Sequence, residues 1–446
     1  MNKLISLLIL GVVLLASINI SKAEGDKVFP YNYTVETLEN GLKVYLIPME
    51  SGGLASYYTV VRTGSRDEVE KGRSGFAHFF EHMMFRGTKK YPQDVYDSIS
   101  ISIGADANAY TTDDYTCYHL NIAAEDLEIV MDMESERFQN LEYKEAPFKT
   151  EAGAVYGEYR KNIANPFMVI WEKLKETAFK DHTYSHTTMG YVEDIKNMPN
   201  LYDYSKGFYD KFYRPENCIL VIAGDIDPKA VMPKVKEYYS AWEAGYQKPE
   251  IKPEPEQTEE RTAETTFDGK TNPIMCIAYK AEAYSPTSKI SMASQLLGQL
   301  AFGSNSDLYK NLYITEQKVT FLSPDFPMNR DPFLNQIWVQ VKDANDLDYV
   351  KSEVLTTIEW YQNNLVDASK LNDLKKRMKY SFLMGLNTPD NVAGGLARFI
   401  AITGGIEGVE DEYKTLDSIT AEDIQKAAMQ MTENKRTVVK LFGTEG

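Results

Sequence analysis

Residues 74–87, Ser-Gly-Phe-Ala-His-Phe-Phe-Glu-His-Met-Met-Phe-Arg-Gly, constrain the fold of this chain more than any other stretch. Ser74 is a residue type that caps helix N-termini, and Gly87 can adopt the left-handed conformation that ends a helix, so we predict about three helical turns between them. His78 and His82 then share one face and can hold one cation, with Glu81 beside them. The other residues make the helix apolar nearly all round, which predicts that it is buried: Phe76, Ala77, Phe79, Phe80, Met83, Met84 and Phe85.

Two interpretations of the three polar residues on this helix are open. In one, the histidines are core residues with satisfied hydrogen bonds, and Glu81 pairs with a lysine or arginine. In the other, the histidines bind a metal ion and Glu81 is a general base. The chain has only 5 histidines, and two of them fall into H-x-x-E-H, the inverted zinc-protease pattern. We therefore favour the metal site.

The N-terminus has the pattern of a secretory signal peptide over residues 1–23. Lys3 precedes an apolar run over residues 4–20, and the small residues Ser21 and Ala23 suit cleavage after Ala23. An uncleaved membrane anchor is the alternative, because the run is at the short limit of a membrane span. We favour cleavage, and no other stretch approaches the length needed to cross a bilayer. We expect an exported protein, periplasmic or secreted, that has no membrane contact after cleavage.

Length, cysteine content and charge limit the possible classes of protein. A chain of 446 residues is too long for one core and predicts two or more domains. Cys117, Cys218 and Cys276 are too few for a disulfide framework, so we expect buried thiols. The formal net charge of −17 argues against a nucleic-acid partner.

Residues 246–262 predict a stiff, solvated linker, because they combine prolines with a charge run and contain almost nothing apolar. This linker divides the mature chain into residues 24–245, which contain the H-x-x-E-H helix, and residues 263–446. Each half ends with a predicted helix, a polar turn, an apolar strand and a glycine. We therefore predict an α+β fold of two similar domains, each a mostly antiparallel sheet with helices packed on one face.

Other elements follow from apolar periodicity. They are a hairpin over 33–49, a strand over 55–62, a strand pair over 108–122, and helices over 92–103, 124–141 and 147–165.

A catalytic zinc site normally has a third protein ligand, which must come from elsewhere in the chain. The helix predicted over 147–165 offers Glu151 and Glu158, two turns apart on one face. Spacing alone does not say which of them binds. The alternative is a solvated helix face on which these carboxylates pair with Arg160 or Lys161.

With these residues the chain resembles the pitrilysin or insulinase family of zinc peptidases, in particular the members of this size that are similar to the catalytic, zinc-bearing subunit of mitochondrial processing peptidase. Three further blocks are similar to family blocks: Gly-Thr at 87–88, Asn-Ala-Tyr-Thr at 108–111 and Ala-Gly-Asp-Ile-Asp-Pro at 223–228. The resemblance runs from about residue 30 to the C-terminus.

The resemblance implies a role for each candidate residue. His78, His82 and Glu158 would bind one Zn²⁺ per chain, and Glu151 would be the carboxylate that orients a ligand. Zinc with this ligand set lowers the pKa of a bound water towards about 7. Glu81 would be the base that takes the proton from this water and passes it to the leaving amine.

Asn108 and Ala109 correspond to the position where family members present an exposed strand edge. A peptide substrate would add there as an extra strand through main-chain hydrogen bonds. The alternative for Asn108 is an ordinary turn residue.

The second half departs from the family pattern. Residues 303–313 align with a family segment in which an arginine, followed seven residues later by a tyrosine, grips the substrate. Here those positions are Tyr313 and Thr320. We expect this half to be structural, and we expect a heterodimer with a homologous chain that supplies the arginine and the tyrosine.

These inferences predict an exported zinc metalloendopeptidase that hydrolyses peptides or unfolded polypeptide segments. A non-catalytic scaffold subunit of a peptidase-like complex is the alternative, and the intact set of candidate ligands argues against it. A metal-binding or storage protein is a third interpretation, but it would not require Glu81.

Overall fold

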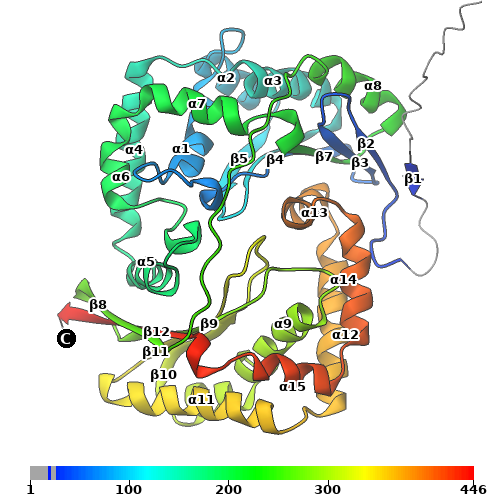
Figure 1. Cartoon of the computed structure of the whole chain (residues 1–446). Coiled ribbons are helices and arrows are strands. Elements are labelled where there is room, and N and C mark those ends of the chain that lie inside the picture. Colours follow the sequence, from blue (N-terminus) through cyan, green and yellow to red (C-terminus); the bar gives the residue numbers. More distant parts are fainter. Residues whose placement is uncertain (1–18, 22–26, 446) are drawn as a thin grey trace, which may run out of the picture.

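Two sheets organise the chain, one in each half (Figure 1). The computed structural model describes residues 19–21 and 27–445. The predicted signal peptide, residues 1–23, lies outside the described residues except for a short strand over residues 19–21.

The first sheet has the strand order β1-β2-β3-β7-β4-β6-β5. Neighbouring strands are antiparallel except for β3 and β7, which are parallel. The strand β5 lies at one edge of this sheet. The strands are β1 (Asn19–Ser21), β2 (Tyr33–Thr37), β3 (Lys43–Pro48), β4 (Leu54–Val61), β5 (Asp106–Thr111), β6 (Thr116–Ala123) and β7 (Cys218–Gly224).

The second sheet repeats this arrangement with five strands. Its order is β10-β11-β9-β12-β8, and β12 and β8 are its parallel pair. Reversed, this order has the same topology as β3-β7-β4-β6-β5, which confirms the prediction of two similar α+β halves. The strands are β8 (Arg261–Lys270), β9 (Ile274–Lys280), β10 (Val319–Asp325), β11 (Leu334–Val341) and β12 (Arg436–Glu445).

Helices follow the strands in both halves. The first half contains α1 (Phe76–Met83), α2 (Gln93–Ser102), α3 (Leu127–Asn140), α4 (Glu145–Asn162), α5 (Pro166–Ala178), α6 (Val192–Asn197), α7 (Tyr202–Phe212) and α8 (Pro228–Tyr239). The second contains α9 (Lys289–Phe302), α10 (Asp307–Tyr309), α11 (Leu347–Asn363), α12 (Ala368–Gly385), α13 (Pro389–Thr403), α14 (Glu407–Ser418) and α15 (Ala421–Met429).

Both faces of the first sheet are buried, although its helices come from two places in the chain. Val44 and Leu46 belong to the core that contains α1, α3 and α8, whereas Tyr45 and Ile47 belong to the core that contains α13. Successive residues of a strand point to opposite faces, so β3 separates these two cores. Helices of the first half therefore cover one face, and α13 of the second half covers the other.

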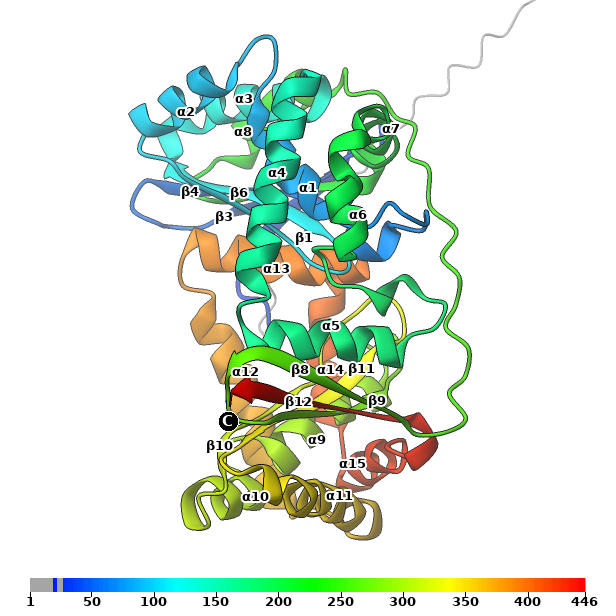
Figure 2. The ribbon, with the colours of Figure 1, turned by 90° about the vertical axis from the view of Figure 1, so that its left-hand side faces the viewer.

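The second sheet has the reciprocal arrangement. Helix α5, from the first half, packs on β8 and β12, and it buries Ile170 and Leu174 against Cys276 and Val439. In Figure 2, α5 lies directly over the second sheet, and α13 lies directly under the first. Each half therefore lends one helix to the sheet of the other half.

The segment between α8 and β8 contains no helix or strand, as expected of a linker, but it is docked on the protein. The Glu254 carboxylate accepts hydrogen bonds from the backbone N–H groups of Lys180, Asp181 and His182, at 2.9–3.2 Å. Gln257 is only 3% exposed. The prediction of a solvated linker is therefore wrong at Glu254 and Gln257. The first half supplies the partners of the Glu254 carboxylate, and the Gln257 side chain donates to the carbonyls of Glu259 and Arg436.

The three cysteines are buried and unpaired, which confirms that they are thiols, and burial raises the pKa of Cys117 to about 12. Within the described residues, no single helix has the length and apolar content to cross a membrane. Only α13 and α14 taken together, with an 87° bend between them, meet that test by length and composition.

Candidate metal centre

Helix α1 carries the H-x-x-E-H residues and is buried, as predicted. It packs against α4, α7 and β6, and the rings of Phe76, Phe79 and Phe80 are inaccessible to solvent. After Met83 the helix continues as one 3₁₀ turn, and this helical segment ends at Gly87, whose φ is 90°. The predicted end of the helical segment at Gly87 is therefore confirmed. Its positive φ suits glycine, but its ψ of −176° lies outside the predicted left-handed helical conformation.

The start of α1 differs from the prediction. The residue before the helix is Gly75, with a φ of 90°, and Ser74 does not cap the helix. Its hydroxyl donates instead to Asp194, at 2.6 Å. The Glu68 carboxylate provides the cap, since it accepts hydrogen bonds from the N–H of Gly75 at 2.7 Å and of Ala77 at 2.6 Å. No spacing rule points to Glu68, because it reaches the helix from a preceding loop.

Three candidate ligands converge between α1 and α4. The Glu158 Oε2 atom lies 3.6 Å from His78 Nε2 and 3.3 Å from His82 Nε2. The three ligand atoms all lie within 4.8 Å of one another. One ion could therefore contact all three side chains after small rotations about their χ angles.

The electrostatics of this group suit a divalent cation. Burial lowers the pKa of His78 to about 4, so its imidazole is neutral at pH 7. The nearby His82 and His78 lower the pKa of Glu158, which favours its carboxylate form. Neutral imidazole nitrogen and carboxylate oxygen are the donors that zinc takes in catalytic sites, so these residues fit a zinc ion.

Glu151 contacts one of the candidate ligands on the side away from Glu158. Its Oε1 accepts a hydrogen bond from His82 Nδ1–H, at 2.8 Å, and its other oxygen pairs with Arg86. This bond fixes the His82 tautomer and turns Nε2 towards Glu158. The structure therefore separates the two carboxylates that spacing left equivalent.

Glu81 lies between the candidate ligands and the strand β5. Thr111 donates a hydrogen bond from its hydroxyl to Glu81 Oε2, at 2.7 Å. Burial raises the pKa of Glu81, and the bond from Thr111 opposes that effect. Sequence reasoning did not single out Thr111, although it belongs to the Asn-Ala-Tyr-Thr block and alternation places it on the same face as Ala109.

A cavity of about 220 Å³ joins Glu81 to the edge strand. Asn108 is exposed and Ala109 is half-buried, and both line this cavity. The predicted residues Glu81, His82, Glu151, Asn108 and Ala109 therefore line one cavity, and His78 and Glu158 adjoin it through their group with His82. The full lining is Glu81, His82, Phe85, Arg86, Gln93, Asn108, Ala109 and Glu151.

Two family models match consecutive parts of the chain. The model described as insulinase (peptidase family M16) matches residues 47–191, and the model described as peptidase M16 inactive domain matches residues 201–378. The chain belongs to peptidase family M16. The first match contains the whole H-x-x-E-H group and α4, so the candidate metal centre lies in the part of an M16 chain that is not described as inactive.

Curated M16 relatives cover most of the chain. The zinc protease PqqE of Helicobacter pylori is 27% identical over 403 residues, which are 88% of this chain and 88% of that protein. The mitochondrial-processing peptidase subunit beta of Caenorhabditis elegans is 24% identical, over 91% of this chain and 88% of that subunit. These relatives support a zinc-protease-like member of M16.

Solved M16 structures share the fold. A protease from Helicobacter pylori has a TM-score of 0.86 and 25% identity, and the alignment covers 92% of this chain and 99% of that chain. Pitrilysin has a TM-score of 0.78 and 18% identity, over 95% of this chain but only 46% of the pitrilysin chain. This M16 chain therefore matches about half of pitrilysin.

Tyr313 and Thr320, in the second half of this M16 chain, are the residues at the positions that the resemblance assigns to a substrate grip. Tyr313 is 41% exposed and stacks on Tyr309, with ring centroids 4.8 Å apart. Thr320 donates a hydrogen bond to the side chain of Gln340, at 2.8 Å. Neither side chain offers the charge of an arginine.

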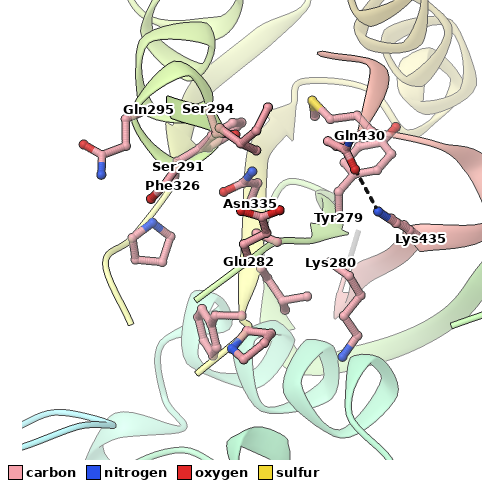
Figure 3. Close-up of a pocket in the computed structure, with 17 residues that line it drawn as sticks. Tyr279, Lys280, Glu282, Ser291, Ser294, Gln295, Phe326, Asn335, Gln430 and Lys435 are labelled. Atoms are coloured by element: carbon pink, nitrogen blue, oxygen red, sulfur yellow. Dashed lines mark hydrogen bonds between the residues drawn. The ribbon is translucent and has the colours of Figure 1, made fainter. Parts of the chain in front are cut away.

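A separate cavity of about 240 Å³ lies between α9 and the strands β9 and β11 (Figure 3). Lys435 donates a hydrogen bond to Gln430 at its rim, at 3.1 Å. The Lys280 ammonium lies over the Phe179 ring, 3.5 Å from its centroid, and burial lowers the pKa of Lys280 to about 7. All the residues that line this cavity belong to the second half, whereas the candidate metal centre lies in the first half, so the two sites are distinct.

Proposed function

We propose that this chain is an exported zinc metalloendopeptidase, one half of a heterodimer, that hydrolyses peptides or unfolded polypeptide segments. The observation that carries the proposal is the convergence of His78, His82 and Glu158, with Glu81 placed between them and the edge strand β5. Membership of M16 supports the peptidase assignment. Export rests on the signal-peptide pattern of residues 1–23.

Each residue has a role in this proposal. His78, His82 and Glu158 would hold the zinc, which when bound would polarise a water molecule and the peptide carbonyl. Glu81 takes the proton of the attacking water and passes it to the leaving amine. Thr111 holds Glu81 in place, since its hydroxyl donates to Glu81 Oε2.

The edge strand β5 binds the substrate in this scheme. Its outer side has no neighbouring strand in the described sheet, so an extended peptide can pair with its main-chain groups. Asn108 and Ala109 lie on this strand beside the cavity that contains Glu81. A peptide paired there would pass in front of the base.

Metal removal tests this proposal directly. We expect the purified protein to bind one equivalent of zinc, and we expect a chelator to abolish cleavage of an unfolded polypeptide in the presence of its partner chain. Cleavage should return when zinc is restored, because the ligands are carried by two helices that pack in one hydrophobic core. A protein that binds no zinc would favour the scaffold alternative.

We predict that the isolated chain is nearly inactive although it binds zinc. The strand β5 is one wall of the substrate site, and Tyr313 and Thr320 lack the chemistry of the missing grip. The partial coverage of pitrilysin is consistent with a second, homologous unit. Adding a homologous partner chain that carries the arginine and the tyrosine should restore cleavage, mainly through a lower KM.

The matched control is the same partner with its arginine replaced by alanine, which should pair with this chain but restore little activity. A purified monomer or homodimer with full peptidase activity would contradict the heterodimer, and would mean that Tyr313, Lys310 or another residue has taken over the grip.

A further inference from the structure

The loop that precedes α1 connects the candidate metal centre to the second half of the chain. It follows β4 and contains a 3₁₀ turn over Ser65–Asp67, and Glu68 comes directly after that turn. Glu68 is buried, and its two carboxylate oxygens accept the N–H groups of Gly75 and Ala77. Ala77 immediately precedes His78, so this cap acts on the turn of α1 that carries the first candidate ligand.

Residues 329–331, in the connection between β10 and β11, contact this loop from the second half. The Arg66 side chain donates from Nε to Asp331 Oδ2, at 2.6 Å, and His182 Nε2 lies 2.9 Å from the same oxygen. Arg66 also pairs with its neighbour Asp67, at 3.2 Å. In Figure 1 the yellow β10–β11 connection reaches towards the first half, where these contacts occur.

The same residues 329–331 also hold the end of the edge strand. Asp114, in the turn between β5 and β6, accepts hydrogen bonds from Asn329 Nδ2 at 2.9 Å and from the N–H of Arg330 at 3.3 Å. The Arg66 N–H donates to the carbonyl of Asp113 in that turn, at 2.8 Å. One connection of the second half therefore clamps both the loop that caps α1 and the turn that ends β5.

We propose that Glu68 is a positioning residue that fixes the first turn of α1, so that His78 faces Glu158, and that residues 329–331 hold the loop that carries Glu68. This inference rests on the proposed function, because it assigns Glu68 to the same metal centre. It also gives the second half a role in its own chain. That half would position the α1 and β5 components of the site without contributing a ligand.

Chemistry explains why a carboxylate is needed at position 68. A carboxylate can accept both N–H groups at once, whereas an amide has one oxygen and would turn its NH₂ towards a second donor. His82 has its own support from Glu151 at the far end of the helix. Loss of the cap should therefore disturb His78 more than His82.

The test compares Glu68→Gln with a matched capping variant, Asp423→Asn, in the full-length protein. Asp423 also caps a helix, because its carboxylate accepts the N–H of Thr420 at the start of α15, in the second half. Both variants should lose stability to thermal unfolding. Only Glu68→Gln should weaken zinc binding, by about 10–100-fold in competition with a chelator, and change the visible spectrum of the Co²⁺-substituted protein.

Asp331→Asn is the second variant, because it leaves Glu68 in place and removes one clamp contact at a partly exposed residue. It should change zinc affinity and the Co²⁺ spectrum in the same direction by less, and it carries the test if Glu68→Gln does not fold. Wild-type zinc affinity and spectrum in Glu68→Gln, or in Asp331→Asn if that variant alone folds, would overturn the inference. Equal loss of affinity in Asp423→Asn would also overturn it, because the effect would then be general destabilisation.

These readouts do not use peptide cleavage. A protein whose zinc affinity depends on Glu68 but which cleaves no peptide would support this inference and contradict the proposed function. An active protein in which Glu68→Gln leaves zinc affinity and the Co²⁺ spectrum unchanged would support the proposed function and contradict this inference.

Discussion

Replacing Glu81 with glutamine should reduce peptide hydrolysis by at least about 10²-fold and leave zinc binding intact. Glutamine has nearly the same size and can still accept the hydrogen bond from Thr111, but it cannot take a proton from water. His78, His82 and Glu158 are unchanged in this variant. Measurement of kcat/KM together with zinc content, on this chain with its proposed partner, separates loss of the base from loss of the metal.

The matched control is Glu172→Gln. Glu172 is also a carboxylate whose pKa burial raises and which accepts a hydroxyl hydrogen bond, from Tyr159 at 3.4 Å. It lies on α5, outside the group of candidate ligands, so its replacement should leave hydrolysis near the wild-type rate. If Glu81→Gln remained active, the general base would have to be sought elsewhere.

Glutamine at position 158 should weaken zinc binding far more than glutamine at position 151. The first change removes the anionic ligand that contacts both histidines, whereas the second removes only the charge behind His82. Loss of an orienting partner typically costs about 10–100-fold in metal affinity, so Glu158→Gln should exceed that range. Competition with a chelator of known affinity measures both variants on one scale.

Glu151→Gln is itself the matched control for Glu158→Gln, because the same substitution is made on the same face of the same helix. Equal metal loss in the two variants, or a larger loss for Glu151→Gln, would reassign the third ligand.

Sequence reasoning reached the site because its components are local. The four-residue spacing of His78 and His82, and the seven-residue spacing of Glu151 and Glu158, fix which side chains share a helix face before any tertiary contact is known. The edge position of β5 came from the family resemblance. The identity of the third ligand also came from that resemblance. In the structure Glu158 faces Nε2 of both histidines, whereas Glu151 contacts only Nδ1 of His82.

Long-range contacts explain what sequence reasoning missed. Ser74 has the chemistry of a helix cap, but Asp194 takes its hydroxyl, and Glu68 caps the helix in its place. Periodicity shows that α5 has an apolar face, but it does not say which sheet buries that face. The clamp by residues 329–331 involves polar side chains with no periodicity at all.

The exchange of α5 and α13 bears on how such a chain can be divided. The repeated strand order divides the chain into two similar units, and a cut in the segment between the two sheets would follow that repeat. Each fragment would nevertheless carry a helix that belongs on the other sheet, and would lack the helix that covers its own. The two fragments would thus remain associated through the two apolar interfaces that α5 and α13 form. We expect that neither repeat folds as an independent domain.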